Sequence, residues 1–367
     1  MRNFYYLIIA LVMVFSCKSS NDSQKKAMSD IDSLFTSLYP AGEPGAAVLI
    51  LKGDDILFQK GYGIADMNTK AMIDHNTFFN IASVSKQFSA VALMMLAEEG
   101  KLSLDDNVKK WFPEFKSPLM EKITLRHLLS HTSGIPDSRD RSNRFFVTTA
   151  IDTQSYAYIS TLEKLNFEPG TSYEYMNPTF QLMYTIVERS SGMSFDDFMR
   201  EKIFDKASMG EATYFESGKE IPRMAHGYLQ DKTSSIFNEY DYLEESFFAT
   251  KADGGLYTSV TEFAKWELAL RNNVLISEQS KLEAHSPKID IADMPYNSYG
   301  YGWFIEKRPG FPVKVYHTGD NGGFQIFAGR YPEKKILYLF FSNRNDRDRE
   351  QTASKLEDIM KSAGWLD

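Results

Sequence analysis

Hydrophobic and polar positions divide the chain into a strand-like beginning, a helical middle and a strand-like end. The apolar run 45–51, the polar turn 52–55 and the short apolar run 56–58 predict a β-hairpin. Between about residues 84 and 272, apolar residues recur at the spacing of a helix. The helices expected there cover residues 86–99, 125–130, 154–165, 178–191, 195–203 and 261–271.

After residue 298, β-branched and aromatic residues dominate, which favours strands. The expected strands cover residues 301–305, 313–317, 324–331 and 336–341, and a final helix covers residues 351–361. Strands at both ends of the chain with helices between them predict one sheet that is assembled from both ends. The expected fold class is therefore α+β, with sheet residues at about 45–82 and 298–345 and a helical insertion at about 100–270.

The N-terminus has a pattern of its own, in which Arg2 precedes an apolar run of about a dozen residues that ends at Phe15. A run of this length suits a signal peptide and is too short to span a bilayer. Ser16 then precedes Cys17, the only cysteine, and this arrangement resembles the bacterial lipobox, where cleavage leaves a lipidated N-terminal cysteine. A plain cleaved signal and an uncleaved anchor are the alternatives.

This pattern divides the chain into three segments. Residues 1–16 form the predicted signal peptide, and residues 17–28 the lipidated cysteine with a polar tether. Residues 29–367 form the predicted folded domain, which opens with a helix that Ser29 caps and Pro40 ends. The expected location is the bacterial cell envelope, facing the periplasm or the outer membrane surface, and the pattern leaves open which membrane holds the lipid.

Composition and charge narrow the range of partners. The chain has 367 residues, of which 43% are hydrophobic and 14% aromatic, and this is ordinary globular composition. Its formal net charge is −8 and it has no run of lysines and arginines, which argues against nucleic acid or an anionic membrane face as a partner. We therefore expect a small-molecule, peptide or ester substrate, membrane contact through the N-terminal lipid only, and a monomer.

Ser83 and Lys86 are the first candidates for chemistry. A serine at the opening of a helix and a lysine three residues later share one helix face, so the hydroxyl and the amine can meet. A serine hydroxyl is a weak nucleophile until a base takes its proton, and a desolvated lysine can be neutral enough to act as that base. The motif alone is weak, because Ser23 and Lys26 have the same spacing. The alternative is an N-terminal helix serine with a solvated lysine.

Two further motifs lie downstream. Tyr175 and Asn177 occupy a loop ahead of a predicted helix, where a tyrosine could shuttle a proton and an asparagine amide could bind the acyl chain of a substrate. The sequence His317-Thr318-Gly319 ends a predicted strand, and the edge of that strand could receive a substrate as an added strand. A core tyrosine with a capping asparagine, and a turn with a surface histidine, are the alternative interpretations.

In this order the three motifs resemble those of the serine penicillin-recognising hydrolases. The similar branch contains class C β-lactamases, D-alanyl-D-alanine carboxypeptidases, D-aminopeptidases and related esterases. Segments 125–136 and 252–259 also look like segments of that family, and the resemblance covers about residues 29–365. It implies a β-lactamase/transpeptidase-like fold, in which a mostly antiparallel sheet flanked by helices packs on an all-helical subdomain and the site lies in the cleft between them.

The resemblance also implies roles for single residues. Ser83 would be the nucleophile, and Lys86 and Tyr175 would share general-base and general-acid work, with the identity of the acylation base left open. Asn177 would hold the substrate amide. The backbone N–H groups of Ser83 and Asp320 would form the oxyanion hole, provided that the Asp320 carboxylate turns away from it.

His317 occupies the position that lysine has in most of the β-lactamases that the chain resembles. A histidine there could donate a hydrogen bond to a substrate carboxylate or to Tyr175, and its charge would vary with pH. Thr318 and Gly319 would complete the substrate-binding strand. The replacement of lysine favours a peptidase over efficient β-lactam hydrolysis.

The expected function is that of an exported serine hydrolase that cleaves an amide or ester through a Ser83 acyl-enzyme, as a D-amino-acid peptidase, a carboxypeptidase-like enzyme or an esterase. A β-lactamase, or a non-catalytic binding lipoprotein with the same fold, is the alternative. We expect no cofactor and no metal. His127 and His131 have a spacing that can hold a metal ion, but no third ligand is evident.

Overall fold

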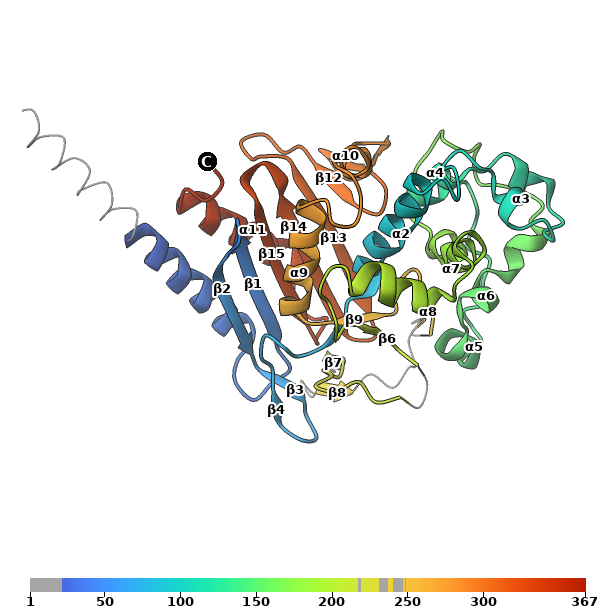
Figure 1. Ribbon diagram of the computed structural model, residues 1–367. Coiled ribbons are helices and arrows are strands. Elements are labelled where there is room, and N and C mark those ends of the chain that lie inside the picture. Colours follow the sequence, from blue (N-terminus) through green and yellow to red (C-terminus); the bar gives the residue numbers. More distant parts are fainter. Residues whose placement is uncertain (1–21, 217–218, 231–236, 240–246, 248) are drawn as a thin grey trace, which may run out of the picture.

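The computed structural model describes residues 22–216, 219–230, 237–239, 247 and 249–367 (Figure 1). The predicted signal peptide, residues 1–16, and the predicted lipidation site Cys17 lie outside the described residues. Within the described part of the chain, no helix is both long enough and apolar enough to cross a membrane.

An eight-stranded antiparallel sheet forms the centre of the molecule (Figure 1). Its spatial order is β10-β11-β12-β13-β14-β15-β1-β2. The strands are β1 (Ala46–Lys52), β2 (Asp55–Tyr62), β10 (Ile289–Asp290), β11 (Asn297–Tyr299), β12 (Phe304–Glu306), β13 (Lys314–Asn321), β14 (Phe324–Tyr331) and β15 (Ile336–Ser342). β1 pairs with β15, with Ala46 opposite Ser342 and Lys52 opposite Ile336. The prediction of one sheet assembled from both ends of the chain is therefore confirmed.

Hydrophobic cores cover both faces of this sheet, because successive side chains of a strand point to opposite faces. Leu49 of β1 belongs to the core that contains α2 and the helical region. Val48 and Ile50 belong to the core beneath the first and last helices, which are residues 22–38 and α11 (Arg349–Ser362). The central strands are therefore packed from both sides.

A helical region lies beside the sheet (Figure 1). The helices after the first one are α2 (Lys86–Glu98), α3 (Val108–Trp111), α4 (Leu125–Leu129), α5 (Arg144–Thr149), α6 (Asp152–Ser155), α7 (Asn177–Ser191), α8 (Phe195–Phe198), α9 (Val260–Arg271) and α10 (Glu278–Ala284). Shorter helical turns are η1 (Ala82–Ser85), η2 (Pro118–Glu121), η3 (Ala157–Thr161), η4 (Met199–Phe204) and η5 (Pro332–Lys334). α2 is central, because every residue from Lys86 to Leu96 is buried.

Short strands also form, in part within the expected helical insertion. They are β3 (Ile64–Asp66), β4 (Ala71–Met72), β5 (Phe79–Asn80), β6 (Thr213–Tyr214), β7 (Tyr228–Gln230), β8 (Phe237–Glu239) and β9 (Leu256–Thr258). β9 pairs with both β5 and β6. This small sheet connects the segment that precedes Ser83 with the end of the helical region.

Three expectations about element boundaries are wrong. The first helix is already present at residue 22 instead of starting at Ser29, and Ala27 in the expected tether is 3% exposed within a core. The helix expected at 154–165 is replaced by two short pieces, α6 and η3, the second of which ends at Thr161. The strand expected at 301–305 begins only at Phe304, after a tight turn.

Candidate active site

Ser83 lies on a tight turn at the entrance to α2. The preceding Ala82 has a φ of +46°, a conformation that side chains rarely adopt, and its N–H bonds to the Asn80 side chain at 2.9 Å. η1 follows and leads directly into α2. Ser83 is partly exposed, whereas Ala82 and Val84 on either side are buried. The turn therefore presents the Ser83 hydroxyl at the surface of a packed core.

Lys86 lies beneath Ser83 and is completely buried. Its Nζ donates a hydrogen bond to Ser83 Oγ at 3.0 Å and another to the carbonyl oxygen of Asp253 at 2.9 Å. Burial lowers the pKa of the Lys86 amine from 10.5 to about 8, although the charge of Asp253 acts to raise it. A neutral amine, which can accept a proton, is therefore accessible near neutral pH.

Tyr175 and Asn177 join the same site from the segment that leads into α7. Lys86 Nζ lies 5.0 Å from the centre of the Tyr175 ring. The Tyr175 hydroxyl and Asn177 Oδ1 are buried and have no hydrogen-bond partner among the described residues. Burial raises the pKa of Tyr175 well above 10, and the neighbouring Ser83 hydroxyl acts to lower it. Buried polar atoms without a protein partner are rare, and beside a serine they indicate groups that can bond to a substrate.

β13 brings the third motif against Ser83. A Cβ atom added to Gly319 would lie 2.5 Å from the carbonyl oxygen of Ile81 and 3.2 Å from the Ser83 nitrogen, so only glycine fits. β12 pairs with β13 only as far as Tyr316, so the next residues of β13 have no β12 partner. The Asp320 side chain is ion-paired with Arg349 at 2.5 Å, which balances its charge.

His317 differs from its expected role. Its Nδ1–H donates to the carbonyl oxygen of Thr318 at 2.7 Å, and its Nε2 accepts a hydrogen bond from the Tyr299 hydroxyl at 3.0 Å. Burial, and next the charge of Lys86, lower the pKa of His317 from 6.5 to about 3. His317 therefore bonds to Thr318 and Tyr299 and not to Tyr175, and its lowered pKa places any change of charge at acidic pH.

In the sequence, His131 is distinguished only by its spacing from His127, and the structure places it beside Tyr175. Its Nδ1 accepts the N–H of Met176 at 3.1 Å, and its carbonyl oxygen accepts the N–H of Glu174 at 3.0 Å. Its ring centre lies 4.3 Å from that of Tyr175. His127 Nδ1 accepts the N–H of Thr124 instead. His131 thus holds the backbone on both sides of Tyr175.

A buried aspartate supports the segment that holds Lys86, and sequence reasoning missed it. Asp152 accepts the N–H groups of Lys251 at 2.7 Å and Ala252 at 3.0 Å, immediately before the Asp253 carbonyl that Lys86 contacts. Ser89 of α2 bonds to the carbonyl of Ala252 at 2.6 Å. Asp152 is an aspartate at the start of a helix, which in sequence is typical of an ordinary cap, so no signal distinguished it.

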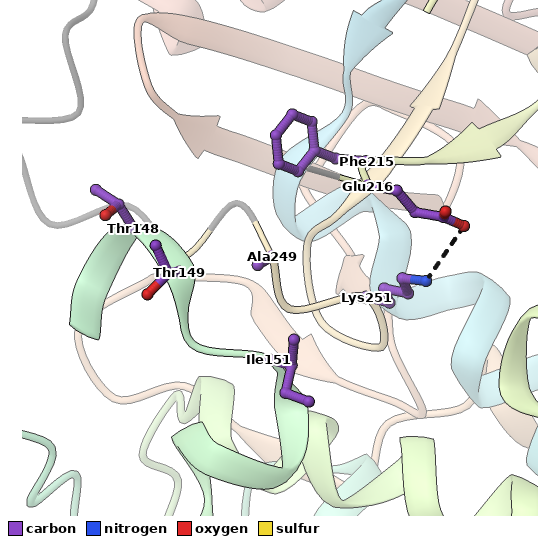
Figure 2. Close-up of a pocket in the computed structure, with 7 residues that line it drawn as sticks. All are labelled: Thr148, Thr149, Ile151, Phe215, Glu216, Ala249 and Lys251. Carbon is purple, nitrogen blue, oxygen red and sulfur yellow. Dashed lines mark ion pairs between the residues drawn. The ribbon is translucent and has the colours of Figure 1, made fainter. Parts of the chain in front are cut away.

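A cavity of about 540 Å³ is lined in part by Lys251 of this segment (Figure 2). Figure 2 shows Lys251 and Glu216 next to each other at one side of the lining, and their charged atoms are 3.8 Å apart. Its lining residues are Thr148, Thr149, Ile151, Phe215, Glu216, Ala249 and Lys251. The lining includes none of the motif residues, so the cavity is separate from the Ser83 site. Thr318, in contrast, lines a cavity of about 430 Å³ next to α11.

Comparison with known proteins gives one consistent family. A family model described as Beta-lactamase matches residues 31–359. Penicillin-binding protein 4* of Bacillus subtilis (strain 168) is 32% identical over 342 residues, which cover 89% of this chain and 74% of that protein. The structure of the octameric penicillin-binding protein homologue from Pyrococcus abyssi is similar, with 27% identity, a TM-score of 0.78, and coverage of 93% of this chain and 77% of that one.

A more distant structure shares the fold. D-amino acid amidase from Ochrobactrum anthropi SV3 has a TM-score of 0.75 at 20% identity, and the match covers 94% of this chain and 99% of that one. The β-lactamase/transpeptidase fold that the sequence motifs implied is therefore confirmed.

Proposed function

The chain belongs to the Beta-lactamase family of serine hydrolases, and from this premise we propose that it cleaves an amide or ester through an acyl-enzyme on Ser83. The observation that carries this proposal is the 3.0 Å hydrogen bond between Lys86 Nζ and Ser83 Oγ. It joins a partly exposed hydroxyl to a buried amine whose pKa is lowered to about 8. A non-catalytic binding protein would have no need to bury a lysine beside a serine.

Lys86 is the better candidate for the base that accepts the Ser83 proton. It contacts Ser83 Oγ directly, and burial shifts its pKa towards neutrality. Burial shifts the pKa of Tyr175 in the opposite direction, so this residue stays protonated and can donate. In our proposal, Ser83 Oγ attacks the substrate carbonyl as its proton moves to Lys86. Tyr175 then protonates the leaving group as the bond to the carbonyl carbon breaks, and the proton held by Lys86 passes to Tyr175, which restores both residues.

The oxyanion that forms on the substrate carbonyl needs hydrogen-bond donors. We assign this role to the backbone N–H groups of Ser83 and Asp320, because the close approach of Gly319 to the Ser83 nitrogen brings the two backbones together. The ion pair with Arg349 balances the Asp320 charge that would otherwise oppose the oxyanion. Asn177 supplies an unpaired amide oxygen for an N–H of the substrate. Water then releases the acyl group from Ser83.

Among the activities of this class, a peptidase, amidase or esterase acting on D-amino-acid derivatives has the best support. The D-amino acid amidase with the same fold supports it in outline. His317 supports it as well, because the histidine is neutral and both of its ring nitrogens are already bonded. A β-lactamase remains the second activity, distinguished by rapid deacylation.

The proposed location is the bacterial cell envelope, with lipid on Cys17 after removal of residues 1–16. The support is the apolar run before the only cysteine. Membrane-fraction analysis of the wild type and Cys17→Ser tests it, and a variant that remains fully membrane-bound would refute lipid anchoring. We propose a monomer, and light scattering would distinguish it from an octamer such as the Pyrococcus homologue.

Intact-mass analysis of the chain from Lys18 onward tests the acyl-enzyme. We expect a fluorophosphonate to add one adduct to the wild type and none to Ser83→Ala. Ser23→Ala is the matched control, because Ser23 and Lys26 repeat the motif spacing outside the site, and it should label normally. A penicillin adduct that persists favours the peptidase, whereas destruction of the drug without an adduct favours a β-lactamase. An adduct that survives in Ser83→Ala would refute the proposal.

A further inference from the structure

The two ring nitrogens of His317 leave no donor for a substrate. Nδ1–H is committed to the Thr318 carbonyl oxygen at 2.7 Å. Nε2 faces the Tyr299 hydroxyl at 3.0 Å and acts as the acceptor, since the other nitrogen carries the proton. Tyr299 is itself completely buried, so this hydroxyl has a fixed place. The group at this position of β13 is therefore a neutral acceptor.

Aromatic rings surround His317 and keep it neutral. Ring centres of Phe304, Tyr299 and Tyr175 lie 5.0, 5.9 and 6.1 Å from the centre of the imidazole. His317 is 1% exposed, so water cannot solvate an added charge. Among the described residues, no carboxylate is hydrogen-bonded to either nitrogen, and Lys86 is the charged group that acts on it most strongly, with the same sign. Protonation would therefore bury an uncompensated cation.

The other cations near β13 are already engaged, most of them in ion pairs. Arg349 bonds to Asp320, to Glu350 and to the carbonyl oxygen of Gly319. Lys314 of β13 is ion-paired with Glu306 and Glu357, and Arg308 with the same two acids. Lys86 is held by two neutral oxygens, the Ser83 hydroxyl and the backbone carbonyl of Asp253, and lies buried beneath Ser83 as the proposed base. In the described part of the chain, Arg349, Lys314 and Arg308 are therefore already paired with carboxylates, and Lys86 is engaged with the nucleophile.

We infer that the leaving group of the substrate is uncharged, so the enzyme acts on amides or esters whose leaving group ends in a neutral function instead of a free carboxylate. This inference rests on the proposed function, in which Tyr175 protonates the leaving group. That proton transfer places the leaving group beside Tyr175, and therefore next to the His317 ring and Thr318. A carboxylate there would lose its water without gaining a cation, which is strongly unfavourable.

The test compares two esters of N-acetyl-D-alanine that differ in one charge. Phenol is the leaving group of the first, and 3-hydroxybenzoic acid, which carries a carboxylate, is that of the second. We expect kcat/KM, corrected for spontaneous hydrolysis, to be at least about tenfold higher for the phenyl ester. Equal values, or a preference for the charged ester, would overturn the inference.

A pair of variants at one position gives an independent measurement. His317→Lys introduces a cation, and His317→Gln introduces a neutral side chain. We expect the ratio of kcat/KM for the charged ester to that for the neutral ester to rise about tenfold in His317→Lys and to stay near wild type in His317→Gln. The same ratio in both variants would contradict the inference. Fluorophosphonate labelling of Ser83 is measured alongside. If the wild-type protein is not labelled, it is the proposed function that has failed.

Discussion

His131→Phe is expected to slow catalysis more than it weakens substrate binding. Phenylalanine keeps an aromatic ring beside Tyr175, where the centres of the two rings are now 4.3 Å apart. It removes His131 Nδ1, which accepts the Met176 N–H at 3.1 Å. A buried N–H left without a partner costs about 1–3 kcal/mol of the free energy of unfolding. The chain can recover part of this cost by moving Met176 towards another acceptor, and Tyr175 moves with it. A displacement of about 1 Å at a catalytic group lowers the rate about 100-fold.

His131→Asn provides the matched rescue. Asparagine Oδ1 occupies the same position along the side chain as histidine Nδ1, so it can accept the Met176 N–H. Asparagine also tolerates the φ of +56° that His131 adopts. We expect kcat within about tenfold of wild type for His131→Asn and about 100-fold lower for His131→Phe, with KM nearly unchanged in both.

The assay is steady-state hydrolysis of the phenyl ester, together with thermal unfolding to confirm that both variants fold. A folded His131→Phe variant with wild-type kcat would refute the idea that the Met176 hydrogen bond positions Tyr175. So would a His131→Asn variant as slow as His131→Phe, because that result would assign the effect to ring packing instead.

Three further predictions follow from the same site. Because burial lowers the pKa of Lys86 to about 8 and the neutral amine is the active form, kcat/KM should rise about tenfold per pH unit below that value and level off above it; a profile that is flat from pH 6 to 9 would contradict this. Burial, and next Asp253, raise the pKa of Asp152 from 3.8 to about 8, so its stabilising contribution is complete below about pH 4 and is lost as the pH rises through 8. Between these pH values, the Tm of Asp152→Asn should therefore fall less than the Tm of the wild type. An equal fall in both proteins would refute the prediction. Gly319→Ala would place a Cβ 2.5 Å from the Ile81 carbonyl oxygen, so fluorophosphonate labelling of Ser83 should slow at least about 100-fold in the folded variant; normal labelling would show that β13 can shift freely.

The sequence was sufficient to predict those elements and contacts that depend on residues close together in the chain. The hairpin of β1 and β2 and the long helices α7 and α9 appear close to their predicted bounds, because apolar spacing reports directly on burial. The meeting of Ser83 with Lys86 was predictable for the same reason, since three residues on a helical turn bring two side chains together.

Contacts between distant segments were not predictable in this way. The Tyr299 hydroxyl reaches His317 because β11, β12 and β13 are neighbours in the sheet, and no single segment contains that register. The helix through residues 22–28 has few apolar positions, so its sequence resembles a tether, and contact with the core fixes it instead. The ion pair of Asp320 with Arg349 likewise depends on where α11 docks.

The sheet that joins distant segments of the chain also makes completion of the Ser83 site depend on long-range folding. The N–H of Gly45, just before β1, bonds to the side chain of Asn343, a residue 298 positions later. Contacts of such long range form late in folding. Ser83 and Lys86 precede Gly319 and the strand that carries it by more than two hundred positions in the chain. A folding chain in which β13 has not yet joined the sheet therefore holds a serine and a lysine without the strand that completes their site.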